Sequence, residues 1–413
     1  MKCQMYDFQK QSVAQLLSGK HIIVSSTGSG KTAMGANWIA EQAERTGKRD
    51  VLIVTTASKA RTSDWEDEIA RWHPSLLNSL SSLSTLSWHK LRAWVDANWG
   101  SLDKYIVVFD EIQKSSAGVS SGMGKAFLKI TKRTSDWAGF TATPGDTWLK
   151  FYPYLVACNL ERNKTSFLRK YANVQTYKGY PEIVGWRNED ELREKWASIS
   201  YAPDTTQVMS ELPPETHKVV EFKKPKAYKW VLKLRKTPDG EFLDTSGALC
   251  AELRRLCFTK EKREWVKEFI EGLGDGAVVF YNFIKTGDEL EEIITKALPK
   301  GARVWRIDGK HHEIPSAETI GKYDVVLCQW QSGSEALNLQ MLHYWVSVEA
   351  CYSYSTSVQA RGRIKRIGQQ NSMFYYYLKT PGTIEDAIYD ALRNKSEFSE
   401  RNWCVDNNLI EGE

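Results

Sequence analysis

The sequence predicts an α/β protein made of two tandem units, each a parallel sheet flanked by helices. Three observations support this prediction. The chain has 413 residues, enough for two to three domains of about 150 residues each. Short apolar segments alternate with amphipathic stretches in both halves of the chain, which is typical of βαβ units. A less regular, aromatic segment near the middle interrupts this alternation once.

Four segments in the first third predict buried strands. They are short, rich in β-branched or aromatic residues, and bounded by Gly, Ser, Thr or Asp. They cover residues 21–26, 51–56, 105–110 and 137–143. Helical patterns at residues 31–44 and 61–72 lie between them, so we expect these strands to pair in parallel.

The second half repeats the pattern after the irregular segment, residues 146–201, which predicts only short helices and loops. Six candidate strands cover residues 217–222, 277–282, 302–308, 324–329, 343–349 and 373–379, and a helix is predicted over 286–297. We therefore expect a first lobe at residues 1–155, a helical or irregular connector at 156–210, and a second lobe at 211–413 that ends in a helical tail.

The composition narrows the class of protein. With 42% hydrophobic and 26% charged residues, the chain is globular rather than disordered. No apolar run approaches the roughly 18–20 residues of a membrane span, and the first ten residues show no secretory signal. Seven scattered cysteines contain no CxxC pair, so neither a disulfide framework nor a zinc site is predicted. We expect a monomeric, cytoplasmic protein with no membrane partner.

The distribution of charge is more informative than the net value of +5, which is 56 basic minus 51 acidic residues. Residues 114–170 contain ten Lys or Arg against three Asp or Glu, and residues 218–236 contain eight against one. Two basic stretches in a nearly balanced chain favour a polyanionic partner, although solvated surfaces would give the same pattern.

A phosphate-binding loop is predicted at residues 26–32, STGSGKT, between a strand and a helix. Glycines let the backbone curl so that successive N–H groups face phosphate oxygens, and the helix N-terminus favours an anion. The candidate cradle consists of Thr27, Gly28, Ser29, Gly30, Lys31 and Thr32. Lys31 would reach the β- and γ-phosphates of ATP and Thr32 would bind Mg²⁺. Ser25 stands where the usual pattern has its first glycine.

The second half of this site is an acid pair at a strand end, in YIVVFDEIQ. Carboxylates at the carboxyl edge of a parallel sheet lie where such sheets bind ligands. Asp110 would hold Mg²⁺, directly or through water, and Glu111 would orient and polarise the attacking water.

These motifs, taken in order, resemble those of superfamily 2 helicases over most of the chain. The pair Phe8-Gln9 resembles the Q-motif that contacts adenine. DEIQ at 110–113 resembles a DExH/D box, TATP at 141–144 the motif that couples hydrolysis to lobe movement, and QARGRIKRIGQ at 359–369 the arginine-bearing motif VI. The resemblance implies two RecA-like lobes with an ATP cleft between them. Coupling would fall to Gln113, Thr141 and Thr143.

The second half resembles the Swi/Snf-type translocases. QARGRIKRIGQ is similar to their QAxxRxxRIGQ pattern, and LPPETHKVVEF (212–222), RIDGK (306–310), SGSEALNL (332–339) and PGTIEDAIYD (381–390) resemble further landmarks. Compact bacterial and bacteriophage-encoded members are similar in length, so such a source is expected. Gln113 replaces the usual His and Ala142 the usual Gly, and little room remains for chromatin-reading domains.

The resemblance implies further site residues. Arg363 and Arg366 would supply positive charge to the transition state, with Arg366 favoured as the arginine finger. Because the two are three residues apart, a helix would place them on one face, with Gln359 one turn earlier. Gly333 and Gln359 complete the expected nucleotide contacts.

Nucleic-acid contacts are expected from small polar residues after strands, because a motor must hold phosphates without preferring a sequence. The candidates in the first lobe are Thr55, Thr56, Ser58, Ser84 and Thr85. Those in the second lobe are Asn282, Ser332 and, in addition to its nucleotide role, Gly333.

We thus expect an ATP- and Mg²⁺-dependent hydrolase that translocates on DNA. Duplex DNA is favoured, single-stranded DNA is possible and RNA is less favoured. Two alternatives remain open at this point: a strand-separating DNA or RNA helicase, and a nucleotide-gated binding or assembly factor with little turnover.

Overall fold

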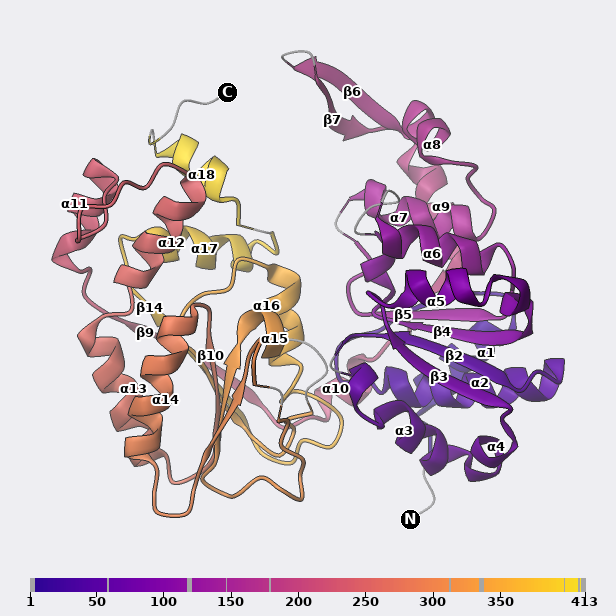
Figure 1. The fold of residues 1–413 in the computed structure, drawn as a ribbon, viewed down its shortest axis with the longest axis horizontal. Helices are drawn as coiled ribbons and strands as arrows, with labels where there is room; N and C mark the ends of the chain where they lie inside the picture. Colours follow the sequence, from indigo (N-terminus) through magenta and orange to yellow (C-terminus); the bar gives the residue numbers. More distant parts are fainter. Residues whose placement is uncertain are drawn as a thin grey trace. The chain divides into compact units, whose positions relative to one another are not determined.

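A computed structural model of the chain describes residues 4–57, 59–116, 121–145, 147–177, 180–311, 313–333, 338–396, 398–407 and 409. The chain divides into two compact units, Met1–Met209 and Ser210–Glu413. Each unit is described by itself below (Figure 1).

The first unit is built on a six-stranded parallel sheet with the strand order β3-β2-β4-β5-β1-β8. Its strands are β1 (Ile22–Val24), β2 (Asp50–Thr55), β3 (Ser82–Ser87), β4 (Tyr105–Asp110), β5 (Trp137–Thr141) and β8 (Ser200–Tyr201). The central strands β2, β4 and β5 are almost entirely buried. Their near-continuous apolar sequences are those expected of parallel strands covered on both faces.

Helices cover both faces of this sheet (Figure 1). One group comprises α1 (Asp7–Leu17), α2 (Lys31–Thr46), α3 (Asp64–Trp72) and α4 (Pro74–Ser79). The other comprises α5 (Leu91–Ala97), α6 (Gly122–Thr131), α7 (Trp148–Ala157) and α9 (Glu189–Ile199). Three 3₁₀ turns join these elements: η1 (Lys59–Arg61), η2 (Trp99–Lys104) and η3 (Ile112–Ser116).

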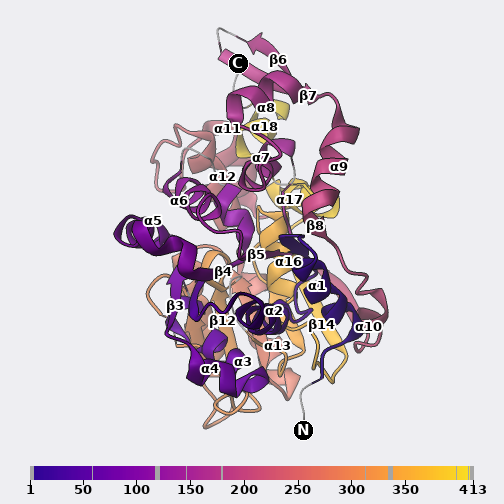
Figure 2. The same ribbon diagram turned by 90° about the vertical axis from the view of Figure 1, so that its right-hand side faces the viewer.

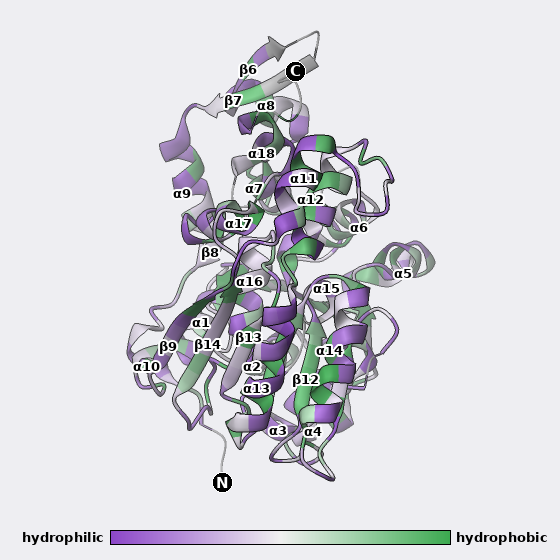
Figure 3. Cartoon of the chain, turned by 90° about the vertical axis from the view of Figure 1, so that its left-hand side faces the viewer, coloured by the Kyte–Doolittle hydropathy of each residue, from purple (hydrophilic) through white to green (hydrophobic). Residues whose placement is uncertain are grey.

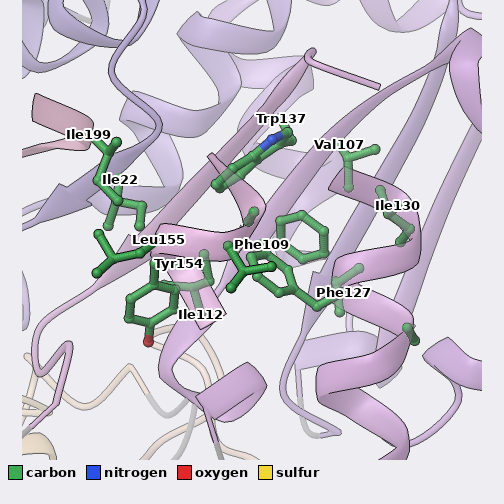
Figure 4. Packing of buried hydrophobic residues seen from close by; sticks show 14 of the residues in the cluster. Ile22, Val107, Phe109, Ile112, Phe127, Ile130, Trp137, Tyr154, Leu155 and Ile199 are labelled. Atoms are coloured by element: carbon green, nitrogen blue, oxygen red, sulfur yellow. The ribbon is translucent and has the colours of Figure 1, made fainter. Parts of the chain in front are cut away.

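The core beneath α6 and α7 is aromatic (Figure 4). Phe109 of β4 and Trp137 of β5 meet Phe127 of α6 edge to face, with ring centroids 5.0 and 5.7 Å from that of Phe127. Ile112, the first residue of η3, packs directly over Gly139, where a Cβ would lie 2.3 Å from its Cδ1. The absence of a side chain at Gly139 therefore lets η3, and the acid box before it, lie close against the sheet.

We predicted a separate connector at residues 156–210, but residues 156–209 belong to the first unit. They form α8 (Lys164–Tyr171), the antiparallel hairpin β6 (Ala172–Tyr177) and β7 (Tyr180–Trp186), α9 and β8. Phe167, Tyr171, Leu192 and Ile199 pack into the same core as Ile22 and Val107, and β8 pairs with β1. The hairpin extends away from the main sheet (Figure 2).

The second unit holds another six-stranded parallel sheet, with the strand order β11-β12-β10-β13-β14-β9. Its strands are β9 (Glu215–Glu221), β10 (Ala277–Tyr281), β11 (Val304–Ile307), β12 (Val325–Gln329), β13 (Tyr344–Ser347) and β14 (Met373–Lys379). Short α10 (Thr206–Ser210) precedes β9.

Helices α13 (Lys260–Leu273) and α14 (Ile284–Ala297) cover one face of this sheet. Both helices contain hydrophilic as well as hydrophobic residues, whereas β12 is strongly hydrophobic (Figure 3). The short α15 (Trp330–Gly333) and α16 (Tyr354–Arg361) contribute to the core on the opposite face. A further apolar cluster joins α11 (Lys226–Leu234), α12 (Ser246–Leu256), α17 (Ile384–Arg393) and α18 (Glu400–Asp406).

All ten predicted strands are present, and the α/β class with two parallel sheets flanked by helices is confirmed. The prediction missed β3, β8 and the β6–β7 hairpin. Strand β3 has the sequence SLSTLS, which contains four small polar residues and lies at the edge of the sheet, so its apolar signal is weak. Within the described residues, none of the helices is both long and apolar enough to cross a bilayer.

Candidate functional site

The loop at residues 26–32 joins β1 to the start of α2, as the phosphate-site prediction requires. Gly28 and Gly30 have φ values of 77° and 81°, in the left-handed region that glycine adopts without strain. The Lys31 ammonium donates to the carbonyl oxygens of Ser25 and Ser26, at 3.0 and 2.9 Å. The lysine side chain thus folds back over its own loop. Thr27 and Thr32 are half-buried.

Ser25, which departs from the usual glycine, braces this loop. Its hydroxyl donates to Ser29 Oγ at 2.7 Å, and Ser29 Oγ donates to the carbonyl oxygen of Ser26 at 2.8 Å. Both serines are buried. The two hydroxyls therefore hold the curled backbone by hydrogen bonds of their own, and a serine at this position is compatible with a phosphate-binding conformation.

Gln9 connects α1 to the same loop. Its Nε2 donates to the carbonyl oxygen of Ser29 at 2.9 Å, and its Oε1 accepts from the backbone N–H of Tyr6 at 2.9 Å. A Cβ at Gly30 would lie 2.5 Å from Nε2, so Gly30 must be small for this contact to form. Phe8 and Gln9 are both buried. Gln9 thus supports the phosphate loop, and its contact with adenine stays a prediction.

Asp110 ends β4 at the carboxyl edge of the sheet and is 2% exposed. Its Oδ2 accepts hydrogen bonds from Thr55 Oγ1 at 2.8 Å and from Lys59 Nζ at 2.9 Å. Burial alone would raise the pKa of Asp110, but Lys59, Thr55 and the more distant charge of Lys31 outweigh burial and lower it. The structure therefore brings Lys31 and Asp110 into one electrostatic site with an ionised carboxylate.

Glu111 follows with a φ of 52°, a left-handed conformation that is uncommon for a residue with a side chain. Gln113 Nε2 donates to Glu111 Oε2 at 2.6 Å, and Thr141 Oγ1 donates to Gln113 Oε1 at 2.7 Å. The backbone N–H of Thr143 then donates to Thr141 Oγ1 at 3.0 Å. A continuous hydrogen-bonded chain links the acid box to the TATP segment through the three residues predicted to couple them.

Two side chains that the sequence did not single out complete the site. Lys59 lies four residues beyond the end of β2, and its only sequence signal is a basic residue after a strand. Tyr154 of α7 is buried, and its hydroxyl donates to the carbonyl oxygen of Pro144 at 3.1 Å. Tyr154 therefore fixes the end of TATP, and burial raises the pKa of its phenol well above the usual value.

The predicted nucleic-acid contacts of the first unit are only partly available. Thr55 is fully buried, and its hydroxyl serves Asp110 rather than a surface. Thr56 is also buried, and Ser58 lies outside the described residues. Ser84 and Thr85 are in strand β3 instead of a loop, and Thr85 Oγ1 donates to Glu66 Oε1 of α3 at 2.7 Å. The side chains of Thr55 and Thr85 thus have structural partners.

In the second unit, backbone groups near Asn282 already have an internal partner. Glu349, 1% exposed, accepts from the N–H groups of Asn282 and Phe283 at 2.6 and 3.1 Å and from Thr286 Oγ1 at 2.9 Å. These donors form the first turn of α14 and the residues before it. The backbone N–H group of Asn282 is therefore used within the unit, whereas its half-buried side chain is still a candidate for a phosphate contact.

The predicted helix carrying Arg363 and Arg366 ends too early. Helix α16 stops at Arg361, Gly362 is its C-cap, and turns follow. Ile364 is fully buried in the core, and the Gln369 amide donates to the carbonyl oxygens of Leu342 and Ile364 at 2.9 and 3.2 Å. These contacts shape the segment into a loop.

Arg363 lies in the turn that follows α16 and Arg366 in the bend after it, so the two half-buried side chains do not share one helical face. Gln359 is half-buried within α16. Ser332 and Gly333 lie in α15. Their expected contacts with nucleic acid and nucleotide stay predictions, and so do the catalytic roles of Arg363 and Arg366.

The residues of the first unit fit ATP and Mg²⁺. The loop has the two left-handed glycines that bring backbone N–H groups to bear on phosphate. Asp110 is ionised and uses only Oδ2 in the two bonds described, and carboxylate oxygen is a preferred Mg²⁺ ligand. Among the described residues, no cluster of three or more His, Cys, Asp or Glu is placed to hold a metal.

Comparison with known proteins places these features in context. No protein-family model matches the chain. The chain is 21% identical to the human DNA annealing helicase and endonuclease ZRANB3 over 97% of its own length, and it spans only 40% of the human protein. It is 22% identical to Protein CHROMATIN REMODELING 20 of Arabidopsis thaliana, over 62% of the chain and 18% of that protein. It is 28% identical to DNA repair protein RAD5 of Cryptococcus neoformans, over 29% of the chain and 10% of that protein.

Among solved structures, the Sulfolobus solfataricus SWI2/SNF2 ATPase core in complex with dsDNA aligns with 96% of this chain and 92% of its own, at 16% identity and a TM-score of 0.44. The similarity to ZRANB3 extends over 97% of the chain and therefore includes both parallel sheets. The chain is thus similar over nearly its whole length to a DNA annealing helicase, and over shorter stretches to a chromatin-remodelling protein and a DNA repair protein, which supports the resemblance to Swi/Snf-type members of helicase superfamily 2.

Proposed function

We propose that the chain is a nucleic-acid-dependent ATPase that uses ATP and Mg²⁺ to move along DNA, with duplex DNA favoured. One observation carries the proposal: the phosphate loop, the ionised Asp110 and the chain from Glu111 through Gln113 to Thr141 lie together at one edge of the first sheet. The curated relatives include proteins named as a DNA annealing helicase and a DNA repair protein, which supports DNA as the track.

Each residue of this edge has a chemical task. The N–H groups of the loop and Lys31 bind the β- and γ-phosphates, while Thr32 and Asp110 hold the metal. When bound, Mg²⁺ offsets the negative charge that redistributes during phosphoryl transfer. Glu111 orients the attacking water and accepts its proton. Gln113 holds the Glu111 carboxylate in place by a hydrogen bond. Because Thr141 is bonded to the same Gln113 side chain, a movement of Glu111 also moves the TATP segment.

Motion requires the second unit. In the proposal, Arg363 and Arg366 supply positive charge to the γ-phosphate, as the family resemblance implies. Binding and hydrolysis of ATP then alternate closed and open arrangements of the two units. Contacts to DNA are mainly to phosphates, because a motor that moves over any sequence cannot depend on base edges.

The test is a steady-state ATPase assay of the full chain with duplex DNA, single-stranded DNA, RNA or no nucleic acid. Salt is held constant, since phosphate contacts weaken steeply as salt rises. We expect Mg²⁺-dependent hydrolysis with the largest stimulation by duplex DNA. Absence of hydrolysis with every nucleic acid would refute the enzyme and leave the gated binding factor, whereas stimulation by single strands together with unwinding of a partial duplex would favour the strand-separating helicase.

A further inference from the structure

Lys59 lies where a metal ion is expected to act. It is the first residue of η1, and its Nζ is 2.9 Å from Asp110 Oδ2. The side chain of Asp110 is 2% exposed and that of Lys59 is 19% exposed. The ammonium therefore provides a full positive charge to a carboxylate that burial would otherwise disfavour.

A second ion pair in the same unit provides a comparison. Lys48 Nζ lies 2.6 Å from Asp136 Oδ2, with side chains 24% and 15% exposed. Asp136 also accepts a hydrogen bond from Gln42 Nε2 at 2.7 Å, and it is not part of the acid box. The two pairs match in chemistry and in the exposure of the lysine, but only Lys59 neutralises the carboxylate that we assign to Mg²⁺.

Lys59 is carried by a short turn outside the sheet. Residue 59 follows the end of β2 by four residues and belongs to a three-residue 3₁₀ turn rather than to the sheet. A lysine side chain is a flexible four-carbon stem with a single charged end. Its ammonium can therefore leave Asp110 without disturbing Thr55, which holds the same carboxylate oxygen from a fully buried strand position.

We propose that Lys59 is an internal counter-cation, which stabilises ionised Asp110 while the site holds no metal and competes with the Mg²⁺ that accompanies the nucleotide. The inference rests on the proposed function, because it requires Asp110 to be a Mg²⁺ ligand. A divalent ion and an ammonium that share one carboxylate repel each other, so each weakens binding of the other. Lys59 thus acts as a positioning residue that sets the Mg²⁺ concentration at which the site fills.

The test measures how much Mg²⁺ is needed for the full chain to bind a fluorescent ADP analogue. Nucleotide is held constant and Mg²⁺ is titrated, so the binding of Mg²⁺ to nucleotide in solution is the same for every variant. We expect Lys59→Met to lower the Mg²⁺ midpoint about tenfold, which corresponds to the loss of one modest competing interaction. Lys59→Arg, which keeps the charge, and the matched control Lys48→Met should stay within about twofold of the wild type.

Two further measurements make the result decisive. In an Asp110→Asn background, Lys59→Met should produce no additional shift, because the shared carboxylate is gone. In metal-free buffer, Lys59→Met should melt at a lower temperature than the wild type, and Mg²⁺ with ADP should restore more of that loss than it does for Lys48→Met. Lys59→Gln provides a second variant if Lys59→Met does not fold.

An unchanged or higher Mg²⁺ midpoint in Lys59→Met, with normal nucleotide binding by the wild type, would overturn the role of Lys59 and leave the proposed function intact. Failure of the wild type to bind the analogue at any Mg²⁺ concentration would refute the proposed function itself, and this inference with it.

Discussion

Asp110 in the first unit and Glu349 in the second are both buried carboxylates at the carboxyl edge of a parallel sheet, yet their environments differ. Asp110 is bonded to Thr55 and to the Lys59 ammonium, and its pKa is lowered. Glu349 is bonded to two backbone N–H groups and Thr286, and burial raises its pKa although Arg254 and these donors oppose the shift.

The difference indicates what each edge is built to do. The first edge keeps an ionised acid next to a phosphate loop, with a second acid, Glu111, in a left-handed conformation beside it. The second edge uses its carboxylate to hold the start of α14, where a negative charge is favourable. Two sheets of the same architecture thus differ in the use of their carboxyl edges. In our account, the edge of the first sheet, with Asp110 and Glu111, is a chemical edge that carries out hydrolysis, and the edge of the second sheet, with Glu349, is a structural edge that stabilises a helix.

The largest expected contrast is between Glu111→Gln and Glu349→Gln. Replacing Glu111 removes the proposed base, so DNA-stimulated hydrolysis should fall by about 10²–10⁴-fold while binding of a fluorescent ATP analogue is kept. Replacing Glu349 keeps an acceptor for the α14 N–H groups, so hydrolysis should stay within about threefold. Steady-state ATPase assays check both, and equal losses in the two variants would contradict the division between the edges.

The next contrast tests the chain from Thr141 to Glu111. Thr141→Val removes the hydroxyl that donates to Gln113, and Gln113→Ala removes the link itself. Both should reduce turnover about 10- to 100-fold, as expected when a catalytic group is slightly misplaced, with little change in nucleotide affinity. Thr141→Ser keeps the hydroxyl and is the matched control. A Thr141→Val enzyme with normal turnover would show that Gln113 does not position Glu111.

Substitution of one threonine in each unit compares the environments of Asp110 and Glu349 directly. Thr55→Val and Thr286→Val each remove one hydroxyl donor from a buried carboxylate, and each should lower the free energy of unfolding by about 1.5–3 kcal/mol. Only Thr55→Val should also change the Mg²⁺ dependence of nucleotide binding. Denaturant unfolding and Mg²⁺ titration measure these effects. A changed Mg²⁺ midpoint of nucleotide binding in Thr286→Val would contradict the assignment of Mg²⁺ to the first unit alone.

The smallest effects are in the pH dependence of stability, and they have opposite signs. The pKa of Asp110 is lower in the folded protein than in the unfolded chain, where it is about 3.9. Ionised Asp110 therefore stabilises the fold at pH values above about 3.9, and this contribution is lost as the pH falls through the pKa of the folded protein. The raised pKa of Glu349 makes the folded form bind its proton more tightly, so stability falls as the pH rises from about 4.3 through the folded value.

Thermal melting of the wild type, Asp110→Asn and Glu349→Gln between pH 3 and about pH 7 checks these signs. The melting temperature of the wild type should exceed that of Asp110→Asn near neutral pH, and this difference should disappear at the acid end. The melting temperature of the wild type should fall below that of Glu349→Gln towards neutral pH. Curves with the same sign for both carboxylates would show that the two sites are electrostatically alike.

Strong local patterns made much of the fold predictable. Strands such as YIVVFD and AVVFYN have near-continuous apolar sequences with polar ends, and the phosphate loop and acid box stand at such ends. Strand β8 has two residues, and the β6–β7 hairpin carries mixed side chains, so neither has a periodic signal. Strand β8 forms by pairing with β1, which lies far away in the sequence, and the two hairpin strands pair with each other.

The sequence predicted which residues belong to the site, but it did not predict their local structure or their hydrogen-bond partners. The three-residue spacing of Arg363 and Arg366 indicated a helix, yet burial of Ile364 and the clamp of Gln369 produce a loop after Arg361. Thr55 had the sequence signature of a surface contact, although it is buried against Asp110. Lys59 had only the weak signal of a basic residue after a strand, because its role depends on the fold bringing residues 59 and 110 together.

The claim that the chemical edge of the first unit drives movement along DNA is tested most directly by displacement of a third strand from a DNA triplex. The wild-type chain should remove the third strand when it moves along the duplex, and only with both ATP and Mg²⁺. Glu111→Gln, which retains nucleotide binding, should leave the triplex intact. Displacement by Glu111→Gln at the wild-type rate, or displacement by the wild type without ATP, would contradict the account.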